Sequence, residues 1–196
     1  VNSTASLDLS DAQHPTVLCN PTEGALLLWL HEKGYDYRQL RADVEIIDEL
    51  PFSTERKCMG TLVRSGLLPG KTILYIKGAT DIIRYYCSDI MGNRSWDDIT
   101  AQLLKWQNQA MRTLGFACMI IPDSSEFKLH EGVISQILDS IKDGNNGLTF
   151  QGIVAIADPV RKEVPDAVRE CLDAGIDVKI VTGDTPGTAK EIGRQV

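Results

Sequence analysis

Gly152-Ile-Val-Ala-Ile-Ala-Asp158-Pro159, followed downstream by Ile176-Asp-Val-Lys-Ile-Val181, is the stretch that decides the fold. Residues 152–157 have the apolar, β-branched composition of a buried strand. Proline has no N–H group for a β-ladder, so we expect this strand to end at Asp158-Pro159. The second apolar run, 176–181, predicts another strand.

The segment between these two runs predicts a helix. Residues 161–174 place apolar side chains at helical spacing, and Gly175 suits the position just after a helix. The result is a strand–helix–strand unit, with Thr182-Gly183-Asp184 at the carboxyl end of its second strand. Ligands of open α/β sheets bind at that edge.

The chain before residue 148 has a different pattern, of helices mixed with strands that are joined by short turns. Residues 1–15 are small and polar, and we expect a loose lead-in there. Strands at 44–50, 58–64 and 71–77 predict an antiparallel meander. The remaining predicted elements are helices at 24–32, 38–42, 80–87, 98–114 and 133–141, and strands at 115–121 and 148–157. The fold class is therefore α+β, a mostly antiparallel sheet flanked by helices, with a shorter α/β segment after it.

The composition excludes several classes of protein. A net charge of −7 and a pI near 5.0 argue against nucleic-acid binding. The sequence has no apolar run long enough to cross a membrane and no signal peptide, so we expect a soluble piece that does not itself insert into a membrane. Five scattered cysteines without a C-x-x-C pair predict free thiols in a reducing compartment. The three histidines are also isolated, and we expect no metal site.

Three short motifs suit phosphate or nucleotide chemistry, and each also has an ordinary structural interpretation. Thr182-Gly183-Asp184 offers a hydroxyl and backbone N–H groups to a phosphoryl group, but could equally be a turn that caps a helix from Pro186. Lys77-Gly78 could place a cation beside a glycine that lets a ligand approach the backbone. The ordinary interpretation is a solvated lysine at a turn between a strand and a helix. Phe52 before Arg56-Lys57 could stack on a base beside cations, or be a core side chain.

The order of the motifs is more specific than any one of them. The chain contains, in sequence, N-P-T-E-G-A-L, P-F-S-T-E-R-K, Y-I-K-G-A, R-T-L-G-F-A, I-A-D-P-V-R-K-E-V and I-V-T-G-D. From about residue 16 onward it resembles the cytoplasmic part of a P-type cation-transporting ATPase, and is most similar to calcium pumps of the plasma-membrane type. In that family a nucleotide-binding domain is inserted into a phosphorylation domain that is similar to haloacid dehalogenases.

The resemblance implies a nucleotide-binding domain at residues 1–158 and part of a phosphorylation domain at 159–196. It implies a role for each matching residue. Glu23 would face the adenine amino group, Phe52 would stack on the ring, Lys57, Lys77 and Gly78 would line the pocket, and Arg112 would reach the phosphates. Asp158, Pro159 and Arg161 would form the hinge between the domains, Thr182 and Gly183 would hold the transferred phosphoryl group, and Asp184 would lie near the nucleotide. The implied partners are ATP or ADP and the rest of the pump: its phosphorylation, actuator and transmembrane domains.

The sequence also departs from the family pattern. Thr54 stands where pumps of the reticulum type carry an arginine, so one phosphate contact differs. The sequence contains neither D-K-T-G-T, with its phosphorylated aspartate, nor G-D-G-x-N-D, which helps to hold Mg²⁺. We therefore expect the chain to bind nucleotide at the cytoplasmic face of a membrane protein, and to be inactive as a pump by itself.

Two alternatives stay open from the sequence. One is a phosphatase of the haloacid-dehalogenase class with residues 1–157 as its cap, which would need a nucleophilic D-x-D or D-x-T motif at a strand end. The other is a non-enzymatic module that binds adenine nucleotides. Such a module would have no need of the D-P-V-R and T-G-D motifs.

Overall fold

The computed structural model describes residues 1–11, 15–65, 68, 70–122, 128–141, 147–157, 160–181 and 186–196. These residues form two compact units. Unit 1 consists of Val1–Asn93 and Leu114–Ile153, and unit 2 consists of Arg94–Thr113 and Val154–Val196. Within the described part of the chain, no helix has both the length and the apolar character needed to cross a membrane.

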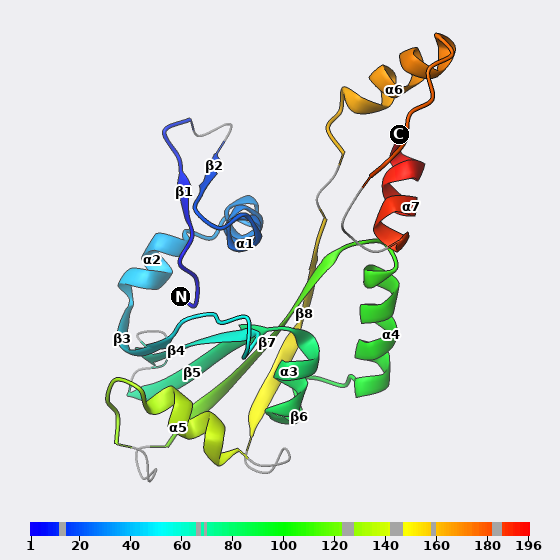
Figure 1. Cartoon of the computed structure of the whole chain (residues 1–196). Coiled ribbons are helices and arrows are strands. Elements are labelled where there is room, and N and C mark those ends of the chain that lie inside the picture. Colours follow the sequence, from blue (N-terminus) through cyan, green and yellow to red (C-terminus); the bar gives the residue numbers. More distant parts are fainter. Residues whose placement is uncertain are drawn as a thin grey trace. The chain divides into compact units, whose positions relative to one another are not determined.

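Unit 1 is built on a six-stranded sheet with the strand order β3-β4-β5-β7-β8-β6 (Figure 1). The first three strands form the predicted antiparallel meander, and β7 pairs antiparallel with β5. At the other edge of the sheet, β6 pairs parallel with β8. The bounds are β3 Val44–Leu50, β4 Cys58–Ser65, β5 Lys71–Gly78, β6 Cys87–Ile90, β7 Arg112–Ile121 and β8 Leu148–Ile156. The predicted α+β class, with a mostly antiparallel sheet flanked by helices, is confirmed.

Two helices of unit 1 begin where the local sequence offers a capping side chain. The side chain of Asn20 accepts hydrogen bonds from the amides of Thr22 and Glu23, and Pro21 is the first residue of α1 (Pro21–Glu32). Asp36 caps α2 (Tyr37–Ala42) in the same way. The other two helices are α3 (Thr80–Tyr85) and α5 (Val133–Ser140).

Helix α5 is capped by a residue that is distant in the sequence. The carboxylate of Asp48 in β3, only 4% exposed, accepts from the amides of Gly132 and Ile134 at 2.8 and 2.9 Å. This contact fixes α5 against β3 and β4, where its apolar side buries Ile134 and Ile137. The core of unit 1 therefore lies between this helix and the sheet.

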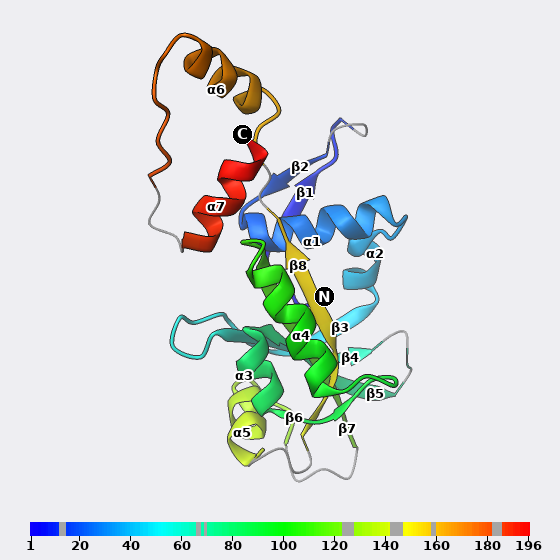
Figure 2. The ribbon, with the colours of Figure 1, turned by 90° about the vertical axis from the view of Figure 1, so that its right-hand side faces the viewer.

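Three predictions about secondary structure in the first part of the chain were wrong. The described residues of the predicted lead-in are ordered, because β1 (Ser6–Asp8) pairs antiparallel with β2 (Thr16–Leu18) and both lie against α1 (Figure 2). The helix predicted at 80–87 ends earlier, and Cys87 already pairs in β6. The helix predicted at 98–114 is α4 (Trp96–Gln107), which stops before Ala110 with a φ of 57°, so that the chain can enter β7.

The stretch around residues 152–181 follows the prediction only in part. Strand β8 and helix α6 (Val164–Asp173) form as expected, and Gly175 has the positive φ of 75° that ends a helix. Residues 153–156 are half-buried, so the prediction of a buried strand is not met there.

The second strand predicted in this stretch, at 176–181, is wrong. The segment has no regular secondary structure and is exposed, with Val181 94% exposed. A strand is stabilised by ladder hydrogen bonds, and no described strand lies beside this segment to supply them. Helix α7 (Pro186–Gln195) follows, beginning at the predicted proline.

Candidate functional site

Glu23 and Lys77 form a buried ion pair in unit 1, although 54 positions separate them in the chain. Glu23 lies in the first turn of α1, and Lys77 lies next to the end of β5. Lys77 Nζ is 2.5 Å from Glu23 Oε1, and the two side chains are 6% and 7% exposed. The structure thus brings together two of the residues to which the resemblance assigned nucleotide contacts.

Residues Asn2–Thr4, which we call the covering segment, lie over this pair and bind both charges. Glu23 Oε2 accepts from the amide and the hydroxyl of Thr4, both at 2.8 Å, and from the hydroxyl of Ser3 at 3.2 Å. The next amide along, that of Ala5, also donates to this oxygen at 3.2 Å. On the other side, Lys77 Nζ donates to the carbonyl oxygen of Asn2 at 2.6 Å. Protein groups therefore satisfy the carboxylate and the ammonium together.

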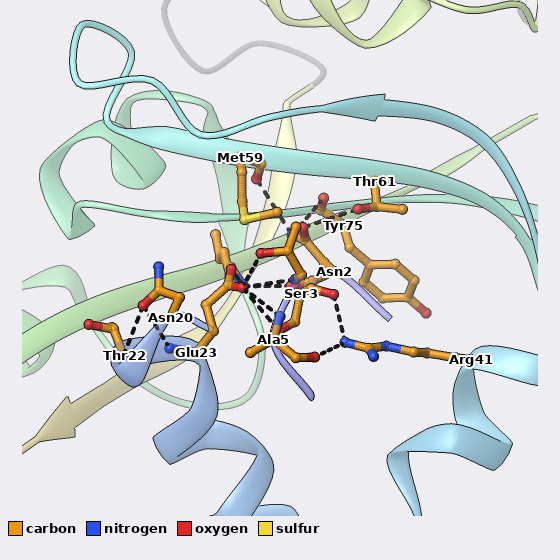
Figure 3. A network of polar contacts seen from close by, with 12 residues as sticks. Asn2, Ser3, Ala5, Asn20, Thr22, Glu23, Arg41, Met59, Thr61 and Tyr75 are labelled. Carbon is orange, nitrogen blue, oxygen red and sulfur yellow. Dashed lines mark hydrogen bonds and ion pairs between the residues drawn. The ribbon is translucent and has the colours of Figure 1, made fainter. Parts of the chain in front are cut away.

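The covering segment is itself fastened at both ends. The Asn2 side chain donates to the carbonyl of Tyr75 at 3.2 Å and accepts from the hydroxyl of Thr61 at 3.1 Å, which ties it to β4 and β5. From α2, Arg41 Nη2 donates to the carbonyls of Ser3 and Ala5 at 2.6 and 2.8 Å (Figure 3). Side-chain contacts from one helix and two strands thus hold the segment in place.

The residue that follows the covering segment is the start of a small apolar cluster. This cluster consists of Ala5, Leu7, Leu27 and Tyr37. The hydroxyl of Tyr37 accepts from the amide of Leu7 at 3.0 Å, and Arg41 lies 4.9 Å from the centre of the Tyr37 ring. Ala5 is completely buried, whereas Thr4 is exposed. The segment is therefore a surface layer with a fixed buried end.

The contacts of the pair set its electrostatics. Burial by itself raises the pKa of Glu23, but the hydrogen bonds from Lys77 and Thr4 outweigh burial and lower this pKa from 4.5 to about 2. Burial lowers the pKa of Lys77, and the Glu23 carboxylate offsets only part of that effect. At neutral pH we expect Glu23 to be ionised and held as an acceptor by several donors.

A second group of predicted residues lies on the loop 51–57, between β3 and β4. Phe52 is 59% exposed, so it is not a core side chain, and Thr54 and Lys57 are also exposed. The loop closes on itself, because the Lys57 amide donates to the carbonyl of Ser53 at 2.8 Å. An exposed aromatic ring and an exposed cation thus share one ordered loop.

Gly78 is where this loop meets β5. The Ala79 amide donates to the Lys57 carbonyl at 2.9 Å. A Cβ atom added to Gly78 would lie 2.3 Å from the Lys57 carbonyl oxygen and 2.7 Å from Cys58 Cα, so only glycine fits here. The tight approach places Lys57 directly beside the strand that carries Lys77.

The other predicted site residues lie in unit 2 or outside the described residues. Arg112 is exposed at the start of β7 and belongs to unit 2. Three residues later in the same strand, Gly115 pairs with Gly78. Arg161 is an exposed residue of unit 2. The remaining predicted residues lie outside the described residues: Asp158, Pro159, Thr182, Gly183 and Asp184.

Sequence reasoning missed the residues that cover and fasten the ion pair. The tetrapeptide Asn2-Ser-Thr-Ala5 has no periodicity that would distinguish it from a loop. The alternation of Ser6, Leu7, Asp8 and Leu9 could have predicted β1. Arg41 carries no signal at all, since its role depends on carbonyl groups that are remote in the chain.

No metal site is formed by the part of the chain that is described. Its His, Cys, Asp and Glu side chains form no group of three or more that could hold an ion.

Comparison with known proteins agrees with this architecture. A family model described as "P-type ATPase, cytoplasmic domain N" matches residues 1–163. The chain is 35% identical to the Calcium-transporting ATPase PAT1 of Dictyostelium discoideum, 31% identical to the Calcium-transporting ATPase 1 of Saccharomyces cerevisiae, and 31% identical to the Plasma membrane calcium-transporting ATPase 1 of Gallus gallus. These alignments cover 99%, 94% and 91% of the chain but only 17%, 19% and 15% of the three relatives. The chain belongs to the P-type ATPases, and the greater part of it corresponds to their cytoplasmic domain N.

Proposed function

We propose that this chain binds ATP or ADP and is the nucleotide-binding portion of a P-type ATPase that couples ATP hydrolysis to calcium transport. Calcium is proposed from the names of the relatives. Because the chain spans less than a fifth of these relatives, the phosphorylated aspartate, the Mg²⁺ ligands and the path of the ion are assigned to the rest of the pump. We expect the chain alone not to pump.

The observation that carries the proposal is the exposed Phe52 ring on the loop that also carries Lys57. An aromatic ring that is 59% exposed offers a face for adenine, and stacking of this kind contributes about 1–3 kcal/mol per base. The Lys57 ammonium, five residues later, is placed to attract phosphate groups. Glycine at position 78 admits the Lys57 backbone, which keeps the loop with Phe52 and Lys57 next to β5.

The remaining residues have proposed roles that follow from the family. Glu23 would accept from the adenine amino group, Lys77 would line the pocket, and Arg112 would contact phosphate. We propose a boundary near residue 158, with Asp158, Pro159 and Arg161 at a hinge into a phosphorylation domain similar to haloacid dehalogenases. In that domain Thr182 and Gly183 would hold the phosphoryl group, with Asp184 near the nucleotide. Mg²⁺ would balance phosphate charge when ATP is bound in the full-length protein.

An amide-shift titration with ATP in the absence of Mg²⁺ tests the proposal. We expect shifts at Phe52, Lys57 and Gly78, and a Kd on the order of 0.1–1 mM. Phe52→Ala should weaken binding at least about fivefold, since it removes the stacking surface. Tyr35→Ala is the matched control, because Tyr35 is also 59% exposed and lies after α1, outside the loop. Equal effects of the two substitutions, or shifts confined to a surface without Phe52, would contradict the assignment.

A further inference from the structure

The covering segment and the proposed nucleotide contacts compete for the same atoms. In the folded chain Glu23 Oε2 accepts from backbone and hydroxyl donors of Ser3 and Thr4, and Lys77 Nζ donates to the carbonyl oxygen of Asn2. An adenine amino group would have to donate to the same carboxylate, and an anionic oxygen would have to accept from the same ammonium. With side chains only 6% and 7% exposed, neither charge has room for both sets of partners.

The segment has the features of a layer that can leave without unfolding unit 1. Asn2 and Ser3 are half-buried and Thr4 is exposed, so the segment contributes little to the core. Its contacts are polar, and water or a ligand can replace them. Ala5, which is completely buried in the small apolar cluster, provides a fixed point at which the segment can turn outward.

We infer that the covering segment is a strap that imitates a ligand: it fills the polar end of the nucleotide site and must be displaced before Glu23 and Lys77 can contact ATP. This inference rests on the proposed nucleotide-binding function. Its consequence is that the apparent affinity for ATP equals the intrinsic affinity multiplied by the fraction of molecules in which the strap is open. Contacts that hold the strap closed therefore weaken ATP binding, although they lie outside the site.

Two substitutions loosen the strap and leave Glu23 and Lys77 unchanged. Asn2→Ala removes the side chain that hydrogen-bonds to the Tyr75 carbonyl and the Thr61 hydroxyl. Thr61→Val removes the hydroxyl that donates to Asn2. Each should lower the apparent Kd for ATP by about three- to tenfold. Thr72→Val is the matched control. It makes the same change at another buried threonine, at the opposite end of β5 from Lys77, where the register partners are Arg64 and Ile121.

Hydrogen exchange at the Thr4 amide reports on the strap directly. This amide is protected by its bond to Glu23, and saturating ATP should raise its exchange rate at least about tenfold. Acylation of Lys77, followed by mass spectrometry in the absence of nucleotide, should be faster in Asn2→Ala and Thr61→Val than in Thr72→Val.

The outcomes separate the strap from the function on which it rests. If ATP shifts the Phe52 resonances but the Thr4 amide stays protected at saturation, the strap is refuted and the proposed function stands. Unchanged or weaker ATP binding by both loosened variants would refute it as well. If ATP produces no shift at Phe52, the proposed function fails, and the competition with ATP fails with it.

Discussion

Replacing Glu23 by glutamine is the most direct test of the buried network. The substitution keeps the size of the side chain and removes its charge. The carboxylate faces only donors: Lys77 on Oε1, and Ser3, Thr4 and Ala5 on Oε2. A glutamine amide would have to direct its own NH₂ group at one of these donors, and it would leave the Lys77 charge buried without a counter-charge.

The size of the effect follows from the pKa of Glu23. A carboxyl group with a pKa of about 2 in the folded protein and 4.5 in the unfolded chain stabilises the fold by about 3 kcal/mol when ionised. Because the folded-state pKa is the lower one, this stability is present above about pH 4.5 and is lost as the pH falls toward 2. We therefore expect Glu23→Gln to reduce the free energy of unfolding by about 3 kcal/mol at pH 7, and by less than half of that near pH 3.

Amide hydrogen exchange at Leu62 and Leu74, both fully buried in the sheet of unit 1, measures this free energy without a signal from unit 2. Glu32→Gln, at the exposed end of α1, is the control and should change the free energy of unfolding by less than about 0.5 kcal/mol. A loss below about 1 kcal/mol at pH 7, or a loss that does not vary between pH 7 and pH 3.5, would refute the reasoning.

Three further substitutions test other parts of unit 1 by the same exchange measurement. Lys77→Met should lower the free energy of unfolding by about 3 kcal/mol, the low end for a broken buried ion pair, because Glu23 keeps its other donors. The double variant with Glu23→Gln should lose less than the sum of the two single losses, and an additive loss would argue against coupling of the two residues. Asp48→Ala should lower the free energy of unfolding by about 1–2 kcal/mol, because it removes the cap of α5. Asp81→Ala, at an exposed position, is the control and should be nearly neutral; equal losses would contradict the capping role. Gly78→Ala should lower the free energy of unfolding by about 1–3 kcal/mol, because its Cβ would meet backbone at 2.3 Å. An unchanged stability would show that the loop can move.

Local sequence signals predicted much of the fold. The meander from Val44 to Gly78 was found almost residue by residue, because apolar strands, short turns and glycines act over a few neighbouring positions. Helix α1 contains the predicted helix 24–32, and its start at Asn20 and Pro21 is likewise set by local signals. Local signals failed where a partner decides the outcome. The apolar run 176–181 has the composition of a strand, yet it forms none without a described neighbouring strand.

The order of motifs in the sequence was enough to identify the family and to single out Glu23, Phe52, Lys57 and Lys77. Only the tertiary structure showed that Glu23 and Lys77 are bound to each other, while Phe52 stands exposed on a separate loop. It also showed that Asn2–Thr4 cover the pair. The physical reason is that motif order depends on the chain alone. Burial and hydrogen-bond partners depend on which distant segments meet, and three small polar residues carry no pattern that says where they will bind.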